Sequence, residues 1–93
     1  MLKLTVVINE GNMLGLKVRS LCKELLGAPD LHTYASNLKT ELSKIKTGNH
    51  AKAELQYTVK IDNEFTNNER VEVWHNSSKK GKPDRLIMSA YSL

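Results

Sequence analysis

The sequence predicts an α+β fold, a two-layer sandwich in which a mostly antiparallel four-stranded sheet carries a helical hairpin on one face. Three observations predict it. Apolar residues alternate over residues 2–8, recur with helical spacing over residues 13–45, and alternate again after residue 50. The element order is therefore β-α-α-β-β-β. A length of 93 residues fits a single domain, residues 1–93, and the sequence contains no internal repeat or linker.

The first strand and the first helix are separated by a change of period at residues 9–12. Residues 2–8 alternate in the manner of a half-buried strand. From Met13 onward the apolar residues fall on one stripe of an amphipathic helix, and Asn12 stands where an N-cap is expected. The stripe consists of Leu14, Val18, Leu21, Cys22 and Leu25. We therefore expect a strand followed by a helix with one buried face.

A second amphipathic helix follows a short break at residues 27–30, which contains glycine and proline. Its apolar stripe extends from Leu31 to Ile45, Asp30 is the expected N-cap, and Gly48 lies just past the end. Because the connection between the two helices is so short, they must form an antiparallel hairpin.

Three strands are predicted after the helices. The second strand begins after His50, residues 63–68 form a turn, residues 70–75 form the third strand and residues 86–91 the fourth. On the second strand, the inner face is predicted to carry Ala53, Leu55, Tyr57, Val59 and Ile61, and the outer face Lys52, Glu54, Gln56, Thr58 and Lys60. The last two strands are joined by a polar loop at residues 76–84.

The register of the last two strands predicts what lies on the sheet face without helices. Pairing Asn76 with Arg85 across the loop keeps the apolar positions together and sets Trp74 on the outer face. The predicted outer surface consists of Trp74, Ile87 and Tyr91, rimmed by Lys60, Arg70 and Arg85. Such a surface suits stacking on bases or anchoring a protein partner. The alternative is that Trp74, the only tryptophan, belongs to the core.

The loop at residues 76–84 is strongly basic. It contains Lys79, Lys80 and Lys82, Arg85 follows it, and Asp84 is its one acidic residue. A lysine ammonium acts as a mobile point charge that displaces counterions from phosphates, so the loop is a candidate phosphate-contacting element. The alternative is a solvated loop whose lysines keep a strand edge soluble.

The composition argues against several classes of protein. The single Cys22 cannot form an internal disulfide, which favours a reduced, cytoplasmic protein. No apolar run approaches the ~18 residues of a membrane span. The histidines show no metal-ligand spacing and no glycine-rich nucleotide motif is present, so we expect neither metal nor cofactor. The net charge of +4 is mildly basic.

The order of a strand, a helical hairpin and a three-stranded meander resembles the RelE/ParE superfamily of small basic toxins, some of which cleave messenger RNA on the ribosome. The resemblance covers topology and size over most of the chain and includes no motif. It implies that side chains on the sheet supply a base, an acid and cationic stabilisation for cleavage at a 2′-hydroxyl. The residues to which it points are Lys52, Lys60, Arg70, His75 and Tyr91.

The leading hypothesis is a non-catalytic binding protein. Lysine and asparagine are frequent and arginine is rare, as AT-rich coding sequences of phages or mobile elements produce. Together with the basic aromatic surface, this predicts a phage-like protein that modulates or inhibits a host nucleic-acid machine such as a polymerase, nuclease or CRISPR effector. Its partner would be a host protein or protein–nucleic acid complex, and the chain itself a monomer or dimer. The alternatives are direct DNA or RNA binding, or an endoribonuclease.

Overall fold

The computed structural model describes residues 1–46, 52–77 and 79–93, and it confirms the predicted α+β fold. Its main elements are β1 (Leu2–Val6), α1 (Met13–Glu24), α2 (Leu31–Leu42), β2 (Tyr57–Asp62), β3 (Arg70–His75) and β4 (Arg85–Ser92). Short 3-10 helices follow α1, at Leu25–Gly27, and precede β2, at Ala53–Leu55. No helix in the described ranges is long and apolar enough to cross a membrane.

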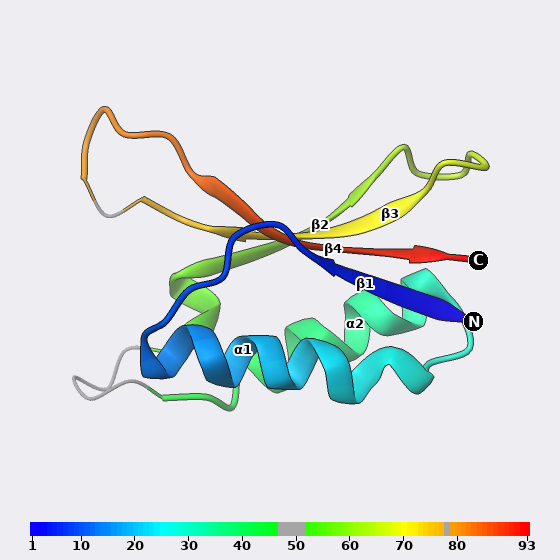
Figure 1. Ribbon diagram of the computed structural model, residues 1–93, viewed down its shortest axis with the longest axis horizontal. Helices are drawn as coiled ribbons and strands as arrows, with labels where there is room; N and C mark the ends of the chain where they lie inside the picture. The colour runs from blue at the N-terminus through cyan, green and yellow to red at the C-terminus, as the bar shows by residue number, and fades with distance from the viewer. Residues whose placement is uncertain (47–51, 78) are drawn as a thin grey trace.

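The sheet is antiparallel at every pairing, and its strand order is β1-β4-β3-β2. Because β1 and β2 lie at opposite edges, the chain between them crosses the full width of the sheet as α1 and α2. Figure 1 shows both helices on the same face of the sheet, antiparallel to each other. The opposite face is not covered by any segment that the structure describes (Figure 1).

Both predicted helix caps are present. The Asn12 side chain accepts a hydrogen bond from the Gly15 amide at 2.7 Å, and Asp30 Oδ1 accepts one from the Thr33 amide at 2.7 Å. The second bond lowers the pKa of the Asp30 carboxyl, since it favours the ionised form. α2 ends at Leu42, earlier than predicted. The predicted C-terminal Gly48 lies outside the described residues.

The core lies between the helix pair and the inner face of the sheet. Its buried side chains include Val18 and Cys22 of α1, Tyr34, Leu38 and Leu42 of α2, and Val71, Val73, Met88 and Ala90 of the sheet. The Tyr34 hydroxyl donates to the Cys22 carbonyl at 2.7 Å, which joins the two helices. Burial raises the pKa of the Cys22 thiol to about 12, as desolvation disfavours the thiolate.

The predicted start of the second strand is wrong. Ala53–Leu55 is a 3-10 helix, and the Leu55 side chain is 70% exposed instead of facing the core. β2 pairs with β3 only from Tyr57, opposite His75, because β3 ends there and the chain leaves the sheet. Within the described residues, 52–56 therefore have no neighbouring strand and only an isolated bridge between Lys52 and Lys46. Lys52 lies outside the sheet, with its ammonium 3.9 Å from Glu54 Oε1.

A β-bulge overturns the predicted place of Ile87. The β3–β4 register matches the prediction from Arg70 opposite Tyr91 as far as Val73, and then shifts, so that Trp74 pairs with Leu86. Ile87 is 1% exposed and belongs to the core. Its carbonyl accepts hydrogen bonds from the backbone amides of residues 7 and 8, at 2.8 and 3.2 Å. Ile87 is therefore absent from the outer surface on which it was predicted.

Candidate functional site

The sheet face opposite the helices carries Trp74 and Tyr91. Side chains alternate along β3, and Val73 is buried against the helices, so Trp74 points to the uncovered face. It is half-buried there. Its indole nitrogen donates to Glu72 Oε1 at 3.3 Å, and Lys60 Nζ lies 5.2 Å from the ring centroid. These contacts make Trp74 a surface residue with polar partners and not a core residue.

Charges of both signs are mixed on this open face. The strand register aligns Lys3, Tyr91, Arg70 and Asp62 across the sheet. In the next row Lys60 stands opposite Glu72. The predicted cations Lys60 and Arg70 are therefore on this face, but each has a carboxylate residue as its cross-strand neighbour. Such a surface is less suited to a polyanion than the sequence alone indicated.

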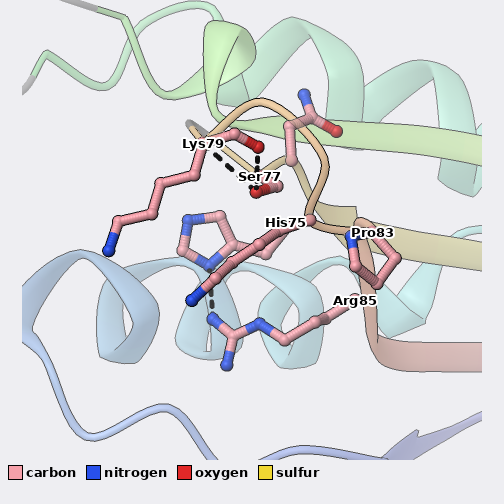
Figure 2. A pocket seen from close by; sticks show the side chains of 7 residues that line it. His75, Ser77, Lys79, Pro83 and Arg85 are labelled. Carbon is pink, nitrogen blue, oxygen red and sulfur yellow. Dashed lines mark hydrogen bonds between the residues drawn. The ribbon is translucent and has the colours of Figure 1, made fainter.

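The β3–β4 hairpin encloses a separate pocket with a volume of about 400 Å³. The residues that line it are His75, Asn76, Ser77, Lys79, Lys82, Pro83 and Arg85. Figure 2 shows His75 and Arg85 on one side, facing the loop segment that carries Ser77 and Lys79. Residues from both sides of the hairpin thus line the same pocket.

Hydrogen bonds give the hairpin loop a defined shape. The Ser77 amide donates to Asp84 Oδ1 at 2.8 Å, which ties the two sides of the loop together. At the tip, the Lys82 amide donates to the Lys79 carbonyl at 3.2 Å. The turn needs Gly81 at φ +87°, a conformation that glycine adopts without strain. The basic side chains therefore stand on a folded turn.

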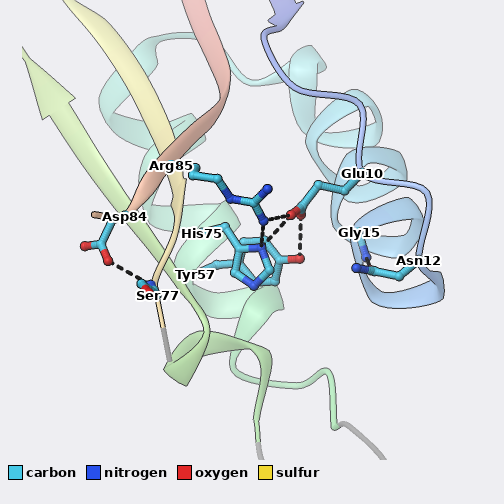
Figure 3. A network of polar contacts seen from close by, with 8 residues as sticks. All are labelled: Glu10, Asn12, Gly15, Tyr57, His75, Ser77, Asp84 and Arg85. Carbon is cyan, nitrogen blue, oxygen red and sulfur yellow. Dashed lines mark hydrogen bonds and ion pairs between the residues drawn. The ribbon is translucent and has the colours of Figure 1, made fainter. Parts of the chain in front are cut away.

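A buried carboxylate contacts two of the residues that line the pocket, His75 and Arg85. The Glu10 side chain, from the connection between β1 and α1, is only 6% exposed. It accepts hydrogen bonds from the Tyr57 hydroxyl at 3.0 Å, from His75 Nδ1 at 2.5 Å and from Arg85 Nη2 at 2.9 Å (Figure 3). The ring of His75 also stacks on Tyr57, with centroids 4.6 Å apart. Burial and the Glu10 charge raise the pKa of the Tyr57 hydroxyl, which therefore remains a donor.

The contacts of Glu10 determine the orientation of the His75 ring. Arg85 Nη2 also lies 3.3 Å from His75 Nδ1, but a guanidinium only donates hydrogen bonds. The shorter contact from Nδ1 to Glu10 places the proton on Nδ1, and both groups donate to the same carboxylate oxygen. Nε2 makes no hydrogen bond to any residue in the described ranges. In Figure 2 it points away from Arg85, toward the side of the pocket that carries Lys79.

The predicted basic aromatic surface is in fact two sites. Lys79, Lys82 and Arg85 line the hairpin pocket, with Lys80 exposed at the tip next to them. Trp74, Tyr91, Lys60 and Arg70 lie on the open face. Arg85 was predicted at the rim of the open face, but its side chain reaches Glu10 on the helix side of the sheet.

The five residues to which the toxin resemblance points are not brought together. Lys60, Arg70 and Tyr91 share the open face, whereas His75 bonds with Glu10 on the other side and Lys52 lies outside the sheet. Glu10 was missed by the sequence analysis. It is a lone acidic residue in a connection, 65 positions from His75, and no pattern links the two.

The chain was compared with known proteins at three levels. No protein-family model, no curated protein and no solved structure matches it. The case for its function therefore rests on the hairpin pocket and the open face.

Proposed function

We propose that this chain is a small binding protein that modulates a nucleic-acid-processing machine, and that it contacts nucleic-acid phosphates with its basic β3–β4 hairpin. One observation carries the proposal. Lys79 and Lys82 line a preformed pocket, and neither ammonium group has a carboxylate partner among the residues that the structure describes. Unpaired cations on a folded turn suit a polyanion, because they release its counterions on binding.

The nearby acidic groups do not cancel this charge. The Asp84 carboxylate accepts the Ser77 amide, and the Glu10 carboxylate is enclosed by three donors. Neither is directed at a ligand. Arg85, with a side chain that is 54% exposed, lies next to the two lysines, but its charge is paired with Glu10 at 2.9 Å. The open face, with Trp74 and Tyr91, would then serve the protein part of the machine, since its mixed charges match a protein surface better than nucleic acid.

The salt dependence of binding tests the phosphate contacts. Each neutralised phosphate adds ~0.9 to the slope of log affinity against log salt on duplex DNA and ~0.7 on single strands. The variant Lys79→Ala, Lys80→Ala, Lys82→Ala should therefore bind a DNA or RNA oligonucleotide more weakly, with a slope smaller by about two to three. Fluorescence anisotropy over a salt series measures both quantities.

A matched control removes the same charge elsewhere. The variant Lys17→Ala, Lys23→Ala, Lys39→Ala changes three exposed lysines on the two helices. Its affinity, and its slope of log affinity against log salt, should stay close to those of the wild-type protein. Only a small decrease is expected, from the lower net charge. If the two triple variants lose affinity equally, the hairpin has no special role and only the overall charge matters.

A second candidate function is metal-independent RNA cleavage, and the fixed His75 ring favours it. With Nδ1 bonded to Glu10, Nε2 is left to take the proton of a 2′-hydroxyl. The 2′-oxygen would attack the phosphorus, the bond to the 5′-oxygen would break, and a lysine ammonium would protonate that oxygen. The cations of Lys82 and Arg85 would stabilise the phosphorane. The products are a 2′,3′-cyclic phosphate and a 5′-hydroxyl.

Cleavage is tested with RNA in the presence of a chelator. The wild-type protein should release fragments that end in a 2′,3′-cyclic phosphate, and a strand of the same sequence with 2′-deoxyribose should remain intact. His75→Gln should lower the rate by about a hundredfold or more, the usual effect of losing a general base. Intact RNA after prolonged incubation with the folded protein would leave binding as the function of this site.

A further inference from the structure

We infer that the hairpin pocket takes the terminal phosphate of a nucleic-acid strand, and not a phosphate within a continuous strand. The inference rests on the proposed function, because it specifies which phosphate the basic hairpin contacts. It draws on the shape of the pocket, on the charges around it and on the hydrogen-bond donors within it.

The shape of the pocket matches the end of a strand. Every described residue that lines it belongs to one hairpin, within residues 75–77 and 79–85. Its volume of about 400 Å³ is typical of sites for small molecules, which fall in the range of roughly 300–1,000 Å³. Proteins that hold a continuous strand use an open groove that follows several nucleotides. A pocket folded within one hairpin has room for one phosphate with its attached sugar.

The charge around the pocket matches a phosphomonoester. A terminal phosphate carries about −1.5 to −2 charges at pH 7, whereas each phosphodiester within a strand carries about −1. Lys79 and Lys82 offer two ammonium groups without carboxylate partners in the described chain. The Arg85 charge is shared with Glu10 at 2.9 Å. The site therefore holds more positive charge than a single phosphodiester needs.

The donors open to an anion are the ammonium groups of Lys79 and Lys82 and the exposed part of the Arg85 guanidinium. The Asn76 amide is not among them, because its Oδ1 accepts from the Thr58 hydroxyl at 2.8 Å and its nitrogen donates to the Leu55 carbonyl at 3.5 Å. A phosphomonoester has three terminal oxygens, one for each of these three side chains, whereas a phosphodiester leaves only two free oxygens.

The experiment compares one short single-stranded oligonucleotide with three kinds of end: a 5′-phosphate, a 3′-phosphate, and hydroxyls at both ends. Fluorescence anisotropy with an internal label gives the dissociation constants. One extra charge close to two ammonium groups should strengthen binding by about tenfold for one of the phosphorylated strands. Adenosine monophosphate is added as a competitor. If adenosine monophosphate binds as tightly as the phosphorylated strand, the pocket is a site for free mononucleotides, and the assignment to a strand end is overturned.

Variants connect the preference to the pocket. Lys79→Ala with Lys82→Ala should abolish the preference for a phosphorylated end, and the charge-matched control Lys17→Ala with Lys39→Ala, on the two helices, should keep it. All are surface changes that leave the core intact. If the hydroxyl-ended strand binds with the expected salt slope and an end phosphate makes no difference, the inference fails and the proposed function stands. If no strand binds the wild-type protein, both fail.

Discussion

Gly15 packs closely against Glu10, the residue that contacts two side chains of the pocket. A Cβ atom added at this position would lie 2.7 Å from the Glu10 Cβ and 3.1 Å from Asn12 Oδ1. The absence of a side chain lets the connection after β1 pack directly on the first turn of α1. This packing holds the Glu10 carboxylate where it accepts hydrogen bonds from His75 and Arg85.

The variant Gly15→Ala should therefore destabilise the protein, although alanine is the better helix former. The helix gains about 1 kcal/mol from the substitution, but forcing a methyl group into a filled site costs about 1–3 kcal/mol. We expect a net loss of about 1 kcal/mol in the free energy of unfolding, measured with urea. Gly11→Ala is the matched control, since nothing lies within 4 Å of the added atom. Equal stability of the two variants would show that Glu10 does not pack against Gly15.

At the scale of elements, periodicity predicted both α-helices and the four strands of the described chain, but neither the 3-10 helix Ala53–Leu55 nor the bulge between β3 and β4. The predicted register holds from Arg70 to Val73 because polar and apolar residues alternate in both strands there. Residues 86–88 are all apolar, so shifting them by one position leaves the pattern unchanged. The sequence therefore held no sign that Ile87 turns inward.

The same limit explains the other differences from the prediction. Apolar and polar residues alternate throughout residues 53–61. A strand, however, extends only as far as it has a neighbour, and β3 ends opposite Tyr57. Lys79, Lys82 and Arg85 could be proposed as a site because they are close in sequence and alike in charge. Glu10 could not, because only the path of the connection between β1 and α1 brings it to His75.

At the scale of the whole molecule, the contact between the two layers stabilises the fold. Leu38, in the middle of α2, is fully buried against the sheet side of the core. A domain of this size has a total stability of about 5–15 kcal/mol, so one large cavity removes a substantial part of it. The helices therefore act as the support on which the open face and the pocket are built.

Leu38→Ala should lower the free energy of unfolding by about 2–5 kcal/mol, through lost burial and the cavity left behind. Leu55→Ala removes the same atoms from a side chain that is 70% exposed, and should change it by less than about 0.5 kcal/mol. Thermal and urea unfolding measure both. Comparable losses in the two variants would contradict the two-layer packing.

The strand order also determines when the chain can fold during synthesis. In the described sheet β1 has β4 as its only neighbour, and β4 is made after every other element. β2 and β3 can form a local hairpin while the ribosome is still translating. β1 cannot pair, and its apolar side chains stay exposed, until β4 has left the exit tunnel. Such non-local pairing is slow, in the range of milliseconds to seconds. A nascent chain halted before β4 would expose its sheet residues to chaperones and proteases, so the cell would carry either the complete fold or none of it.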